Sequence, residues 1–531
     1  MNIMKYLTFK TLTFGILLIF VYGSACTDLT EETPDAQTSL ETEEEFIAAL
    51  GEAYSILEGT WGSNWKGFYP LTEVSTDEMV VPQRGADWFD GGVWIQTHRH
   101  TTPVDHGPTG DAWNFLFSGV NATSRLILQF ETLADAGQLD QDMADSFIGE
   151  LRVLRGFYYF WLLDTFGNVP IIDNFADVAG NPPNHTDFQA GRTELFNFIE
   201  SEVVGSIDGL SDDPRASYGR MHQDAAHFLL GKLYLNAEVW TGTPRWNDAV
   251  SHFDAIINSG NYNLEPDYFA NFAVDNAGAS ETIFAIPYDQ VFLPGFNFHH
   301  MTLHYNHQFT FDFEEQPWNG YATLAEFYRS FEEDDVRKGD GQTRGLLVGP
   351  QYDMAGNPLI DTDIGEDHHL TLEIDIPALI MTGEELAQPS REKGARFAKF
   401  EYEIGATPDL NNDFPVFRYG DVLLSKAEAL WRQNPADAEA LMLVNQIRNR
   451  AGVQDFAQLT PENLLAERGR ELYTEQWRRQ DLIRFDGIAG GETRFNDPWW
   501  EKDTSPSHRN VFPIPQDQID ANPNLNQNPG Y

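Results

Sequence analysis

Apolar residues recur at three- and four-residue spacing in several stretches of the chain, which is the pattern of amphipathic helices. The clearest stretch spans residues 147–165, and Gly167 is expected to close it. Its apolar positions are Phe147, Leu151, Leu154, Tyr158 and Trp161. The pattern therefore predicts one long helix with a strongly aromatic end.

Two further helical stretches form a pair. The first covers residues 226–237 and ends near Gly242, and the second covers residues 246–257 and ends at Gly260. Their combined length of about 34 residues is the period of a tetratricopeptide unit. One such unit cannot bury its faces alone, so other helices should stack on it. Further predicted helices are 46–57, 112–133, 195–207, 422–431, 436–450 and 461–484.

Two long segments lack a sustained helical period and are rich in Gly, Pro, Asn and aromatic residues: 60–110 and 270–415. Segments of this length without regular structure are usually functional loops or a subdomain. We predict a mostly α fold in which residues 41–269 and 416–531 form a tetratricopeptide-like helical scaffold. The two irregular segments are inserted in it and form the ligand-binding face.

The first 25 residues have the layout of a secretory signal. Lys5 and Lys10 precede an apolar stretch at 12–22, and no acidic residue occurs before Asp28. The stretch is too short for a permanent membrane span, which needs ~20 apolar residues. We therefore predict that residues 1–25 are cleaved.

Cys26, the only cysteine, follows the small residues Gly23, Ser24 and Ala25. This order is similar to the lipoprotein box of bacteria, with Gly23 where Leu is usual. The alternative is a buried free thiol, but residues 26–40 are polar and acidic, as expected of a tether. We predict that Cys26 is lipidated and holds the protein on a membrane.

The composition narrows the range of partners. The 531 residues are 41% apolar, as expected of a folded protein, and carry a net charge of −48. Removal of residues 1–25 removes Lys5, Lys10 and no acid, so the mature charge is −50. Such a surface repels nucleic acid, anionic lipid headgroups and, more weakly, polyanionic glycans. Adaptation to a salty habitat is an alternative cause.

Catalytic and metal-binding motifs give no positive signal. His98, His100 and His106, and the run His299, His300, His304 and His307, suggest metal ligation, but no HExxH arrangement is present. No GxSxG motif, phosphate loop or dinucleotide fingerprint stands in a fitting context. We therefore predict no metal, no cofactor and no enzyme, and we assign these histidines to loop packing or ligand hydrogen bonding.

Several passages resemble the SusD/RagB-type proteins, in order along nearly the whole mature chain. They are LRVLRGFYYFW at 151–161, FGNVP at 166–170, GKLYLNA at 231–237, DVLLSKAEA at 421–429, NQIRNRAG at 445–452, ERGREL at 467–472, RRQDLIRF at 478–485, and the closing passage 512–531. The resemblance implies an outer-membrane lipoprotein of Bacteroidota-type bacteria with four tetratricopeptide-like units. It also implies a lid on a SusC-like TonB-dependent transporter that imports glycan or, in some cases, peptide.

The charged residues of these motifs also have a structural interpretation. Arg152 and Arg155 can pair with acids such as Glu150 or with loop carbonyls, and Glu475 and Arg479 stand at i,i+4 spacing. We interpret them as scaffold rather than as a binding site.

A glycan-binding surface needs exposed aromatic rings beside polar side chains. The segment 75–94 supplies this combination, and its Thr-Asp-Glu is similar to the family's entry into a ligand-contacting loop, which places Trp88 and Trp94 there. In the segment 316–321, Tyr321 matches an aromatic ligand contact of the family after an Asn-Gly pair. The candidate site residues are the aromatics Trp88, Trp94, Trp318 and Tyr321 and, more weakly, Arg84, Asp87, Asn319 and His98.

The alternative is that these aromatics are buried loop core, as large aromatics usually are. The sequence predicts a non-catalytic surface protein that captures oligo- or polysaccharide, neutral and glucan-like. The other hypotheses are a peptide-binding importer subunit and a surface glycoside hydrolase.

Overall fold

The computed structural model describes residues 42–59, 67–177, 180–383, 387–487 and 495–531. The predicted signal peptide, Cys26 and the tether at 26–40 lie outside the described residues. Contacts divide the chain into a short unit, Met1–Ala48, and a large unit, Ala49–Tyr531. In the short unit, the described residues begin helix α2, Glu43–Glu58. The following paragraphs concern the large unit.

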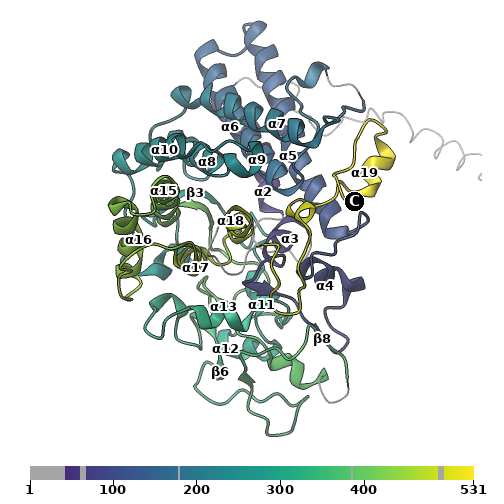
Figure 1. Ribbon diagram of the computed structural model, residues 1–531, viewed down its shortest axis with the longest axis vertical. Coiled ribbons are helices and arrows are strands. Elements are labelled where there is room, and N and C mark those ends of the chain that lie inside the picture. The colour runs from purple at the N-terminus through teal and green to yellow at the C-terminus, as the bar shows by residue number, and fades with distance from the viewer. Residues whose placement is uncertain (1–41, 60–66, 178–179, 384–386, 488–494) are drawn as a thin grey trace, which may run out of the picture. The chain divides into compact units, whose positions relative to one another are not determined.

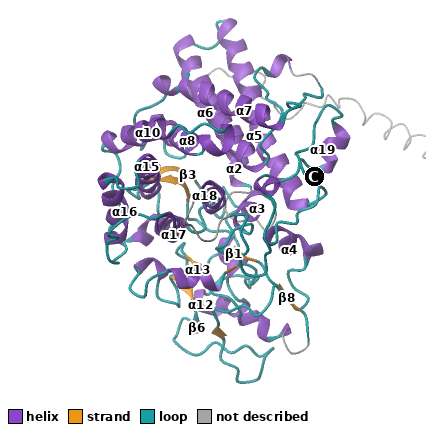
Figure 2. Ribbon diagram, viewed as in Figure 1, coloured by secondary structure: helices purple, strands orange, loops and turns teal. Residues whose placement is uncertain are grey.

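Paired helices dominate the first half of the large unit (Figures 1 and 2). They are α5 (Gly107–Asp135), α6 (Gln141–Thr165), α7 (Phe188–Val204), α8 (Gln223–Leu235), α9 (Ala237–Thr241) and α10 (Trp246–Ser259). Helix α6 packs between α5 and α7, and α8 packs on α10. Asp140 caps the start of α6, where its carboxylate accepts from the N–H groups of Asp142 and Met143. The predicted helices of this half are confirmed, and so is the helix pair.

The helices of the second half continue this stack. They are α15 (Tyr419–Gln433), α16 (Ala438–Arg450), α17 (Pro461–Leu472), α18 (Arg478–Phe485) and α19 (Gln516–Ala521). Helix α15 packs on α10, α16 and α17. The fold is therefore mostly α and tetratricopeptide-like, as the helical periods predict. The chain end lies against α6, where Phe512 N–H donates to the Thr165 carbonyl at 2.8 Å.

The prediction of one continuous helix at 461–484 is wrong. The chain breaks between α17 and α18, where Thr474 and Gln476 have φ values of 63° and 67°. Distant carboxylates stabilise this break: Glu78 accepts from Thr474 N–H at 2.8 Å, and Glu73 accepts from Gln476 N–H at 2.5 Å. These bonds join residues about 400 positions apart, so no local pattern announces them.

Short strands connect the two irregular segments to each other. β1 (Met79–Val80) pairs antiparallel with β4 (Ala322–Thr323), and β2 (Gln83–Arg84) pairs parallel with β8 (Ile380–Met381). The remaining antiparallel pairs are β3 (Thr282–Ile286) with β10 (Phe414–Arg418), β5 (Gly345–Leu347) with β9 (Arg396–Ala398), and β6 (Gly349–Pro350) with β7 (Thr371–Leu372). Short helices also occur there: α3 (Phe68–Glu73), α4 (Val93–His98), α11 (Phe298–Thr302), α12 (Gln308–Phe311) and α13 (Ala325–Ser330). The first pairing brings residues near 80 beside residues near 320, and the second brings residues 83–84 beside residues 380–381.

Most of the charged residues in and near the sequence motifs are buried in ion-pair networks, whereas Arg152 is 43% exposed and pairs with Glu131 at 3.6 Å. Arg418 contacts Glu281, Glu471 and Glu475 at 2.6–3.1 Å. Elsewhere in the scaffold, Arg155 pairs with Glu202 at 2.5 Å. The side chains of Arg418 and Arg155 are at most 2% exposed, which agrees with their interpretation as scaffold.

The expected helical pair of Glu475 with Arg479 does not form. Glu475 instead pairs with Lys399 and Arg418, and Arg479 pairs with Asp164 at 3.1 Å. The reason is the break before α18, which removes the helical spacing between the two side chains.

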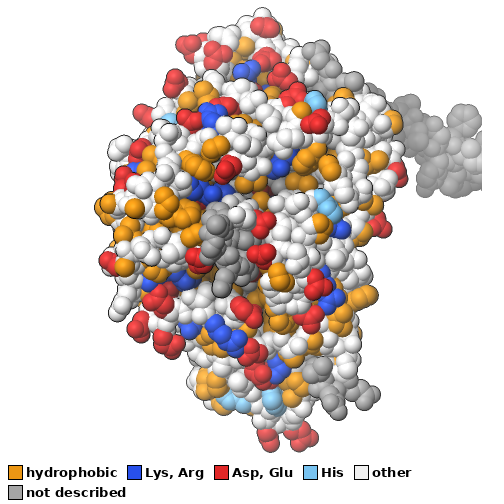
Figure 3. Space-filling view, in the orientation of Figure 1, with side chains coloured by type: hydrophobic (Ala, Val, Ile, Leu, Met, Phe, Trp, Pro, Cys, Tyr) orange, Lys and Arg blue, Asp and Glu red, His pale blue; other side chains and the backbone are white. Residues whose placement is uncertain are grey.

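The surface is rich in acidic side chains. Figure 3 shows them spread over the visible face with basic side chains between them, in keeping with the net charge of −48. In the described parts of the chain, no helix combines the length and the apolar character that a membrane span requires.

Candidate functional site

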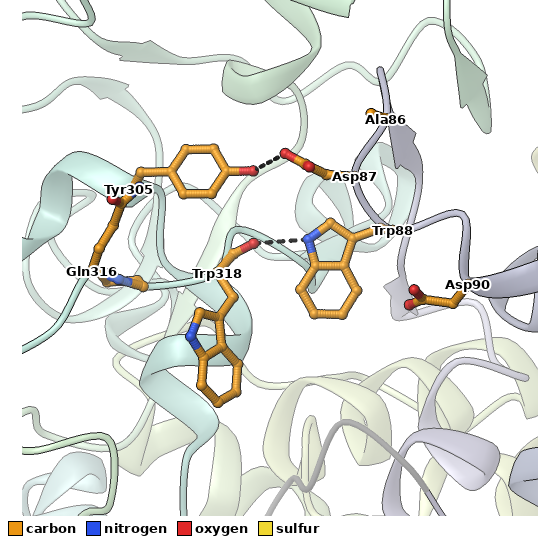
Figure 4. Close-up of a pocket in the computed structure, with 8 residues that line it drawn as sticks. Ala86, Asp87, Trp88, Asp90, Tyr305, Gln316 and Trp318 are labelled. Atoms are coloured by element: carbon orange, nitrogen blue, oxygen red, sulfur yellow. Dashed lines mark hydrogen bonds between the residues drawn. The ribbon is translucent and has the colours of Figure 1, made fainter.

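A cavity of about 690 Å³ opens where the loop after β2 meets the segment that follows α11. It lies between residues 86–88 and 90 on one wall and residues 305 and 316–318 on the other (Figure 4). Its lining residues are Ala86, Asp87, Trp88, Asp90, Tyr305, Gln316, Pro317 and Trp318. We call it the first cavity. The two segments that the sequence singles out therefore face each other across one space.

Two hydrogen bonds connect the walls of the first cavity (Figure 4). The Trp88 indole N–H donates to the Trp318 carbonyl at 2.8 Å, and the Tyr305 hydroxyl donates to the Asp87 carboxylate at 2.6 Å. Burial, with a smaller effect of Asp87, raises the pKa of Tyr305 to about 12. The hydroxyl therefore stays protonated at neutral pH and keeps its bond to Asp87.

The backbone of both walls is held in an unusual conformation. Trp88 and Asn319 have φ values of 63° and 59°, and positive φ is a genuine outlier for a bulky residue such as tryptophan. This conformation places the Trp88 ring directly over Gly320, where a Cβ would lie only 2.6 Å from the ring. The absence of a side chain at Gly320 is what allows the indole to lie there.

Replacement of Gly320 by alanine should disturb the first cavity without unfolding the protein. The new Cβ would also lie 2.9 Å from the Met301 carbonyl. Overpacking of this kind costs about 1–3 kcal/mol, and we expect the displaced Trp88 ring to weaken ligand affinity roughly tenfold. Titration calorimetry measures the ligand affinity of the variant. Gly110→Ala is the control, because a Cβ added at Gly110 would meet nothing within 4 Å. Equal affinity of the Gly320→Ala variant and the wild type would contradict the role given to the Trp88 ring.

Arg84 and Asn319 lie beneath the first cavity and do not line it. The Arg84 guanidinium is buried and donates to the carbonyls of Asn319, at 3.1 Å, and of Ser390. Burial lowers the pKa of Arg84 to about 10, so it remains charged at neutral pH. The Asn319 side chain accepts from Arg396 at 2.7 Å and donates to the Arg391 carbonyl at 3.1 Å. Both residues position the wall that carries Trp318.

The structure brings three of the predicted residues together and separates the others from the cavity. Asp87, Trp88 and Trp318 line it. The expectation that Trp94 and Tyr321 expose their rings is wrong, because their exposed fractions are 2% and 0%.

The two buried rings have structural partners. Trp94 donates to Asp90 at 2.7 Å and packs edge-on to Trp88 at 6.1 Å. Tyr321 packs against Phe298 and Tyr69. The lack of helical period in these segments suggested exposure, but the two loops pack on each other and bury the rings.

His98 is also removed from the candidate ligand contacts. Its ring is fully buried and bonds to the Trp500 carbonyl at 2.8 Å, and burial lowers its pKa to about 4. His304 and His307 are likewise buried, with pKa values lowered by burial to about 4 and about 3. Among the residues that the structure describes, no group of three or more His, Cys, Asp or Glu side chains is placed to hold a metal ion.

Sequence reasoning missed Tyr305, Gln316 and Asp90. Tyr305 lies inside the histidine-rich run, which drew attention for metal chemistry rather than for its aromatic residue. An aromatic beside an amide, Tyr305 followed by Asn306, is the same signal that identified the other loops. The completed first cavity offers three aromatic side chains, two carboxylates and one amide, a set that suits a ligand with apolar faces and hydroxyl groups.

The fold and the cavity define a binding protein in which a helical-repeat scaffold carries a site built from loops. A family model described as the SusD family matches residues 396–531. The starch-binding protein SusD of Bacteroides thetaiotaomicron is 27% identical, over 88% of this chain and 86% of its own length. A SusD-like protein of Bacteroides ovatus is 22% identical, over 87% and 80% of the two chains.

Solved structures share the fold. Surface glycan-binding protein A from Bacteroides uniformis has a TM-score of 0.71 at 21% identity, with 92% of this chain and 99% of that chain covered. The protein of the same name from Bacteroides thetaiotaomicron, in complex with laminarihexaose, has a TM-score of 0.70 at 20% identity and the same coverage. Residues 396–531 thus match the SusD family model, and the chain is similar over most of its length to SusD and shares the fold of these solved structures.

Proposed function

We propose that this protein is a non-catalytic cell-surface glycan-binding protein. It captures oligo- or polysaccharide in the first cavity and delivers it to a SusC-like TonB-dependent transporter of the outer membrane. The observation that carries the proposal is the joint placement of Trp88, Trp318 and Tyr305 beside Asp87 and Gln316 in one cavity.

The chemistry of the first cavity fits a sugar chain. Sugar rings have apolar C–H faces that pack on aromatic planes, and their hydroxyl groups donate to carboxylates and amides. The volume of about 690 Å³ lies within the usual range of small-molecule sites. The ligand is oriented by a few polar groups, whereas the aromatic rings supply most of the buried surface.

Charge favours a neutral glycan. Asp87 and Asp90 both line the first cavity, and the chain as a whole carries −48. These charges repel uronate or sulfate groups but not uncharged hydroxyls. Two of the similar proteins are named for starch binding and for a complex with laminarihexaose, and the glucan-like part of the proposal rests on this likeness.

The cellular setting of the proposal rests on the N-terminus. A cleaved signal at 1–25 and a lipid on Cys26 would hold the protein on the outer membrane, with residues 26–40 as the tether. The similarity to SusD-type proteins supports the transporter partner. Such a placement lets the captured glycan pass directly to the transporter.

A titration panel tests the function. Purified protein is titrated calorimetrically with laminarin, starch and xylan, and with polygalacturonate and a peptide mixture for comparison. We expect binding to at least one neutral polysaccharide, none to polygalacturonate, and no rise in reducing ends during incubation. Binding to peptides alone would favour a peptide importer subunit, and a time-dependent rise in reducing ends would identify a glycoside hydrolase.

A further inference from the structure

A second cavity, of about 710 Å³, lies apart from the first and is formed by other segments. Its walls are the 3-10 helix Tyr268–Phe272, the C-terminal end of α12, two turns at 342–344 and 352–356, and residues 399–404. It shares no lining residue with the first cavity.

The two turns that form one side of the second cavity are held by their own side chains. Asp340 accepts from the N–H groups of residues 342–344 at 2.8–2.9 Å. Asp353 accepts from the N–H groups of Ala355 and Asn357 at 2.9 and 2.7 Å. The wall is therefore built before any ligand arrives, which lowers the entropic cost of binding.

The second cavity offers the same types of side chain as the first. The Tyr352 side chain is 39% exposed, and the Thr310 hydroxyl donates to its carbonyl at 2.8 Å. The Arg344 guanidinium lies over the Phe269 ring at 4.6 Å, is about half exposed, and donates to the Asp267 carboxylate at 2.9 Å. Gln342 lines the same wall. Aromatic surface beside amide and guanidinium donors suits the C–H faces and hydroxyls of a sugar chain.

One segment of the chain connects the two cavities. Tyr305 lines the first cavity, Thr310 and Phe311 line the second, and Gln316 lines the first again. Five residues of extended chain span at most about 18 Å, so Tyr305 and Thr310 cannot lie further apart than this.

Exposed apolar side chains mark the surface between and around the cavities. Thirteen large hydrophobic residues are exposed in the described chain, and five of them belong to this region: Phe309, Tyr352, Met354, Ile360 and Ile404. Tyr352, Met354 and Ile404 line the second cavity, and Met354 N–H donates to the Phe309 carbonyl. The Asn306 side chain, next to Tyr305 of the first cavity, donates to the Ile360 carbonyl. A concentration of this kind marks a binding surface rather than chance exposure.

We propose that the second cavity is a second glycan-binding site, which holds a distant part of the same neutral polysaccharide chain that occupies the first cavity, with Tyr352 and Arg344 as its contacts. This inference rests on the proposed function. When two sites on one protein contact the same long ligand, the ligand binds more tightly than at either site alone, although no new contact is made. The second cavity thus selects polysaccharide over short oligosaccharide.

The test compares a long and a short ligand on single variants. Laminarin or starch, whichever binds the wild type, is titrated beside laminaritriose or maltotriose. Tyr352→Ala is expected to weaken polysaccharide affinity about tenfold and to leave trisaccharide affinity within about twofold. Phe292→Ala is the matched control, since that ring is 82% exposed and lines neither cavity. Thermal unfolding of each variant verifies the fold.

The outcomes separate this inference from the proposed function. Polysaccharide affinity of Tyr352→Ala equal to that of the wild type overturns the second site and leaves the first intact. An equal loss of affinity for polysaccharide and trisaccharide also overturns the second site, because the two cavities would then not act as separate sites. If the wild type binds no glycan, or if the Tyr352→Ala change weakens peptide binding instead, both proposals fail.

Discussion

Replacement of Trp318 by alanine is expected to weaken glycan binding strongly while the protein stays folded. The Trp318 side chain is half-buried and lines the first cavity, and its backbone carbonyl, which the substitution retains, holds the Trp88 indole. Tryptophan is among the residues whose truncation costs most at a binding site, typically about 2–4 kcal/mol. The expected loss of affinity is therefore about 30- to 1000-fold.

Titration calorimetry with the polysaccharide that binds the wild type measures this effect. Phe89→Ala is the matched control, because Phe89 is 50% exposed and adjacent to Trp88 in sequence but does not line the first cavity. We expect its affinity to stay within about twofold of the wild type. Unchanged affinity of the Trp318→Ala protein would exclude the first cavity as the glycan site.

Replacement of Glu471 by alanine is expected to destabilise the scaffold severely. Its carboxylate contacts Arg418 at 2.6 Å, Arg450 at 2.5 Å and Arg337 at 3.0 Å, and all four side chains are at most 5% exposed. Burial alone would raise the pKa of Glu471, but the three guanidinium groups hold it well below its usual range. Removal of the carboxylate deprives three buried guanidinium groups of one partner each, although each keeps another carboxylate. Loss of one partner from a buried ion pair typically costs about 3–5 kcal/mol.

Urea unfolding followed by tryptophan fluorescence measures the loss. Glu471→Gln serves as a second variant, since it keeps the shape and removes only the charge, and we expect it to be destabilised as well. The control is Asp375→Ala, because the ion pair of Asp375 with Arg329 is exposed on both sides and should contribute nothing measurable. A Glu471→Ala protein as stable as the Asp375→Ala protein would show that the buried network does not hold the scaffold.

The local sequence pattern was sufficient to predict the helical scaffold and part of the candidate site. The helical periods at 147–165, 226–237 and 246–257 correspond to α6, α8 and α10. The segment 75–94 was identified because it places aromatic residues beside polar ones, and Trp88 and Asp87 in it do line the first cavity. These features are local, and a helix face or a loop composition is visible without knowledge of the partner.

Long-range contacts decided the rest. Whether Trp94 and Tyr321 are exposed depends on loops that pack from distant parts of the chain, and both rings proved buried. Tyr305 joined the first cavity through its bond to Asp87, 218 positions away.

The sequence by itself determined the helical-repeat architecture, the acidic charge and the family resemblance, and the lipid anchor at Cys26 stays a prediction. Only the tertiary structure decided which aromatics form the first cavity and where the helix at 461–484 breaks. It also revealed that a second cavity shares the bordering segment 305–316 with the first. The physical reason is that helix periodicity reports how one segment turns its own face to the core. Burial and cavity shape depend instead on which segments meet.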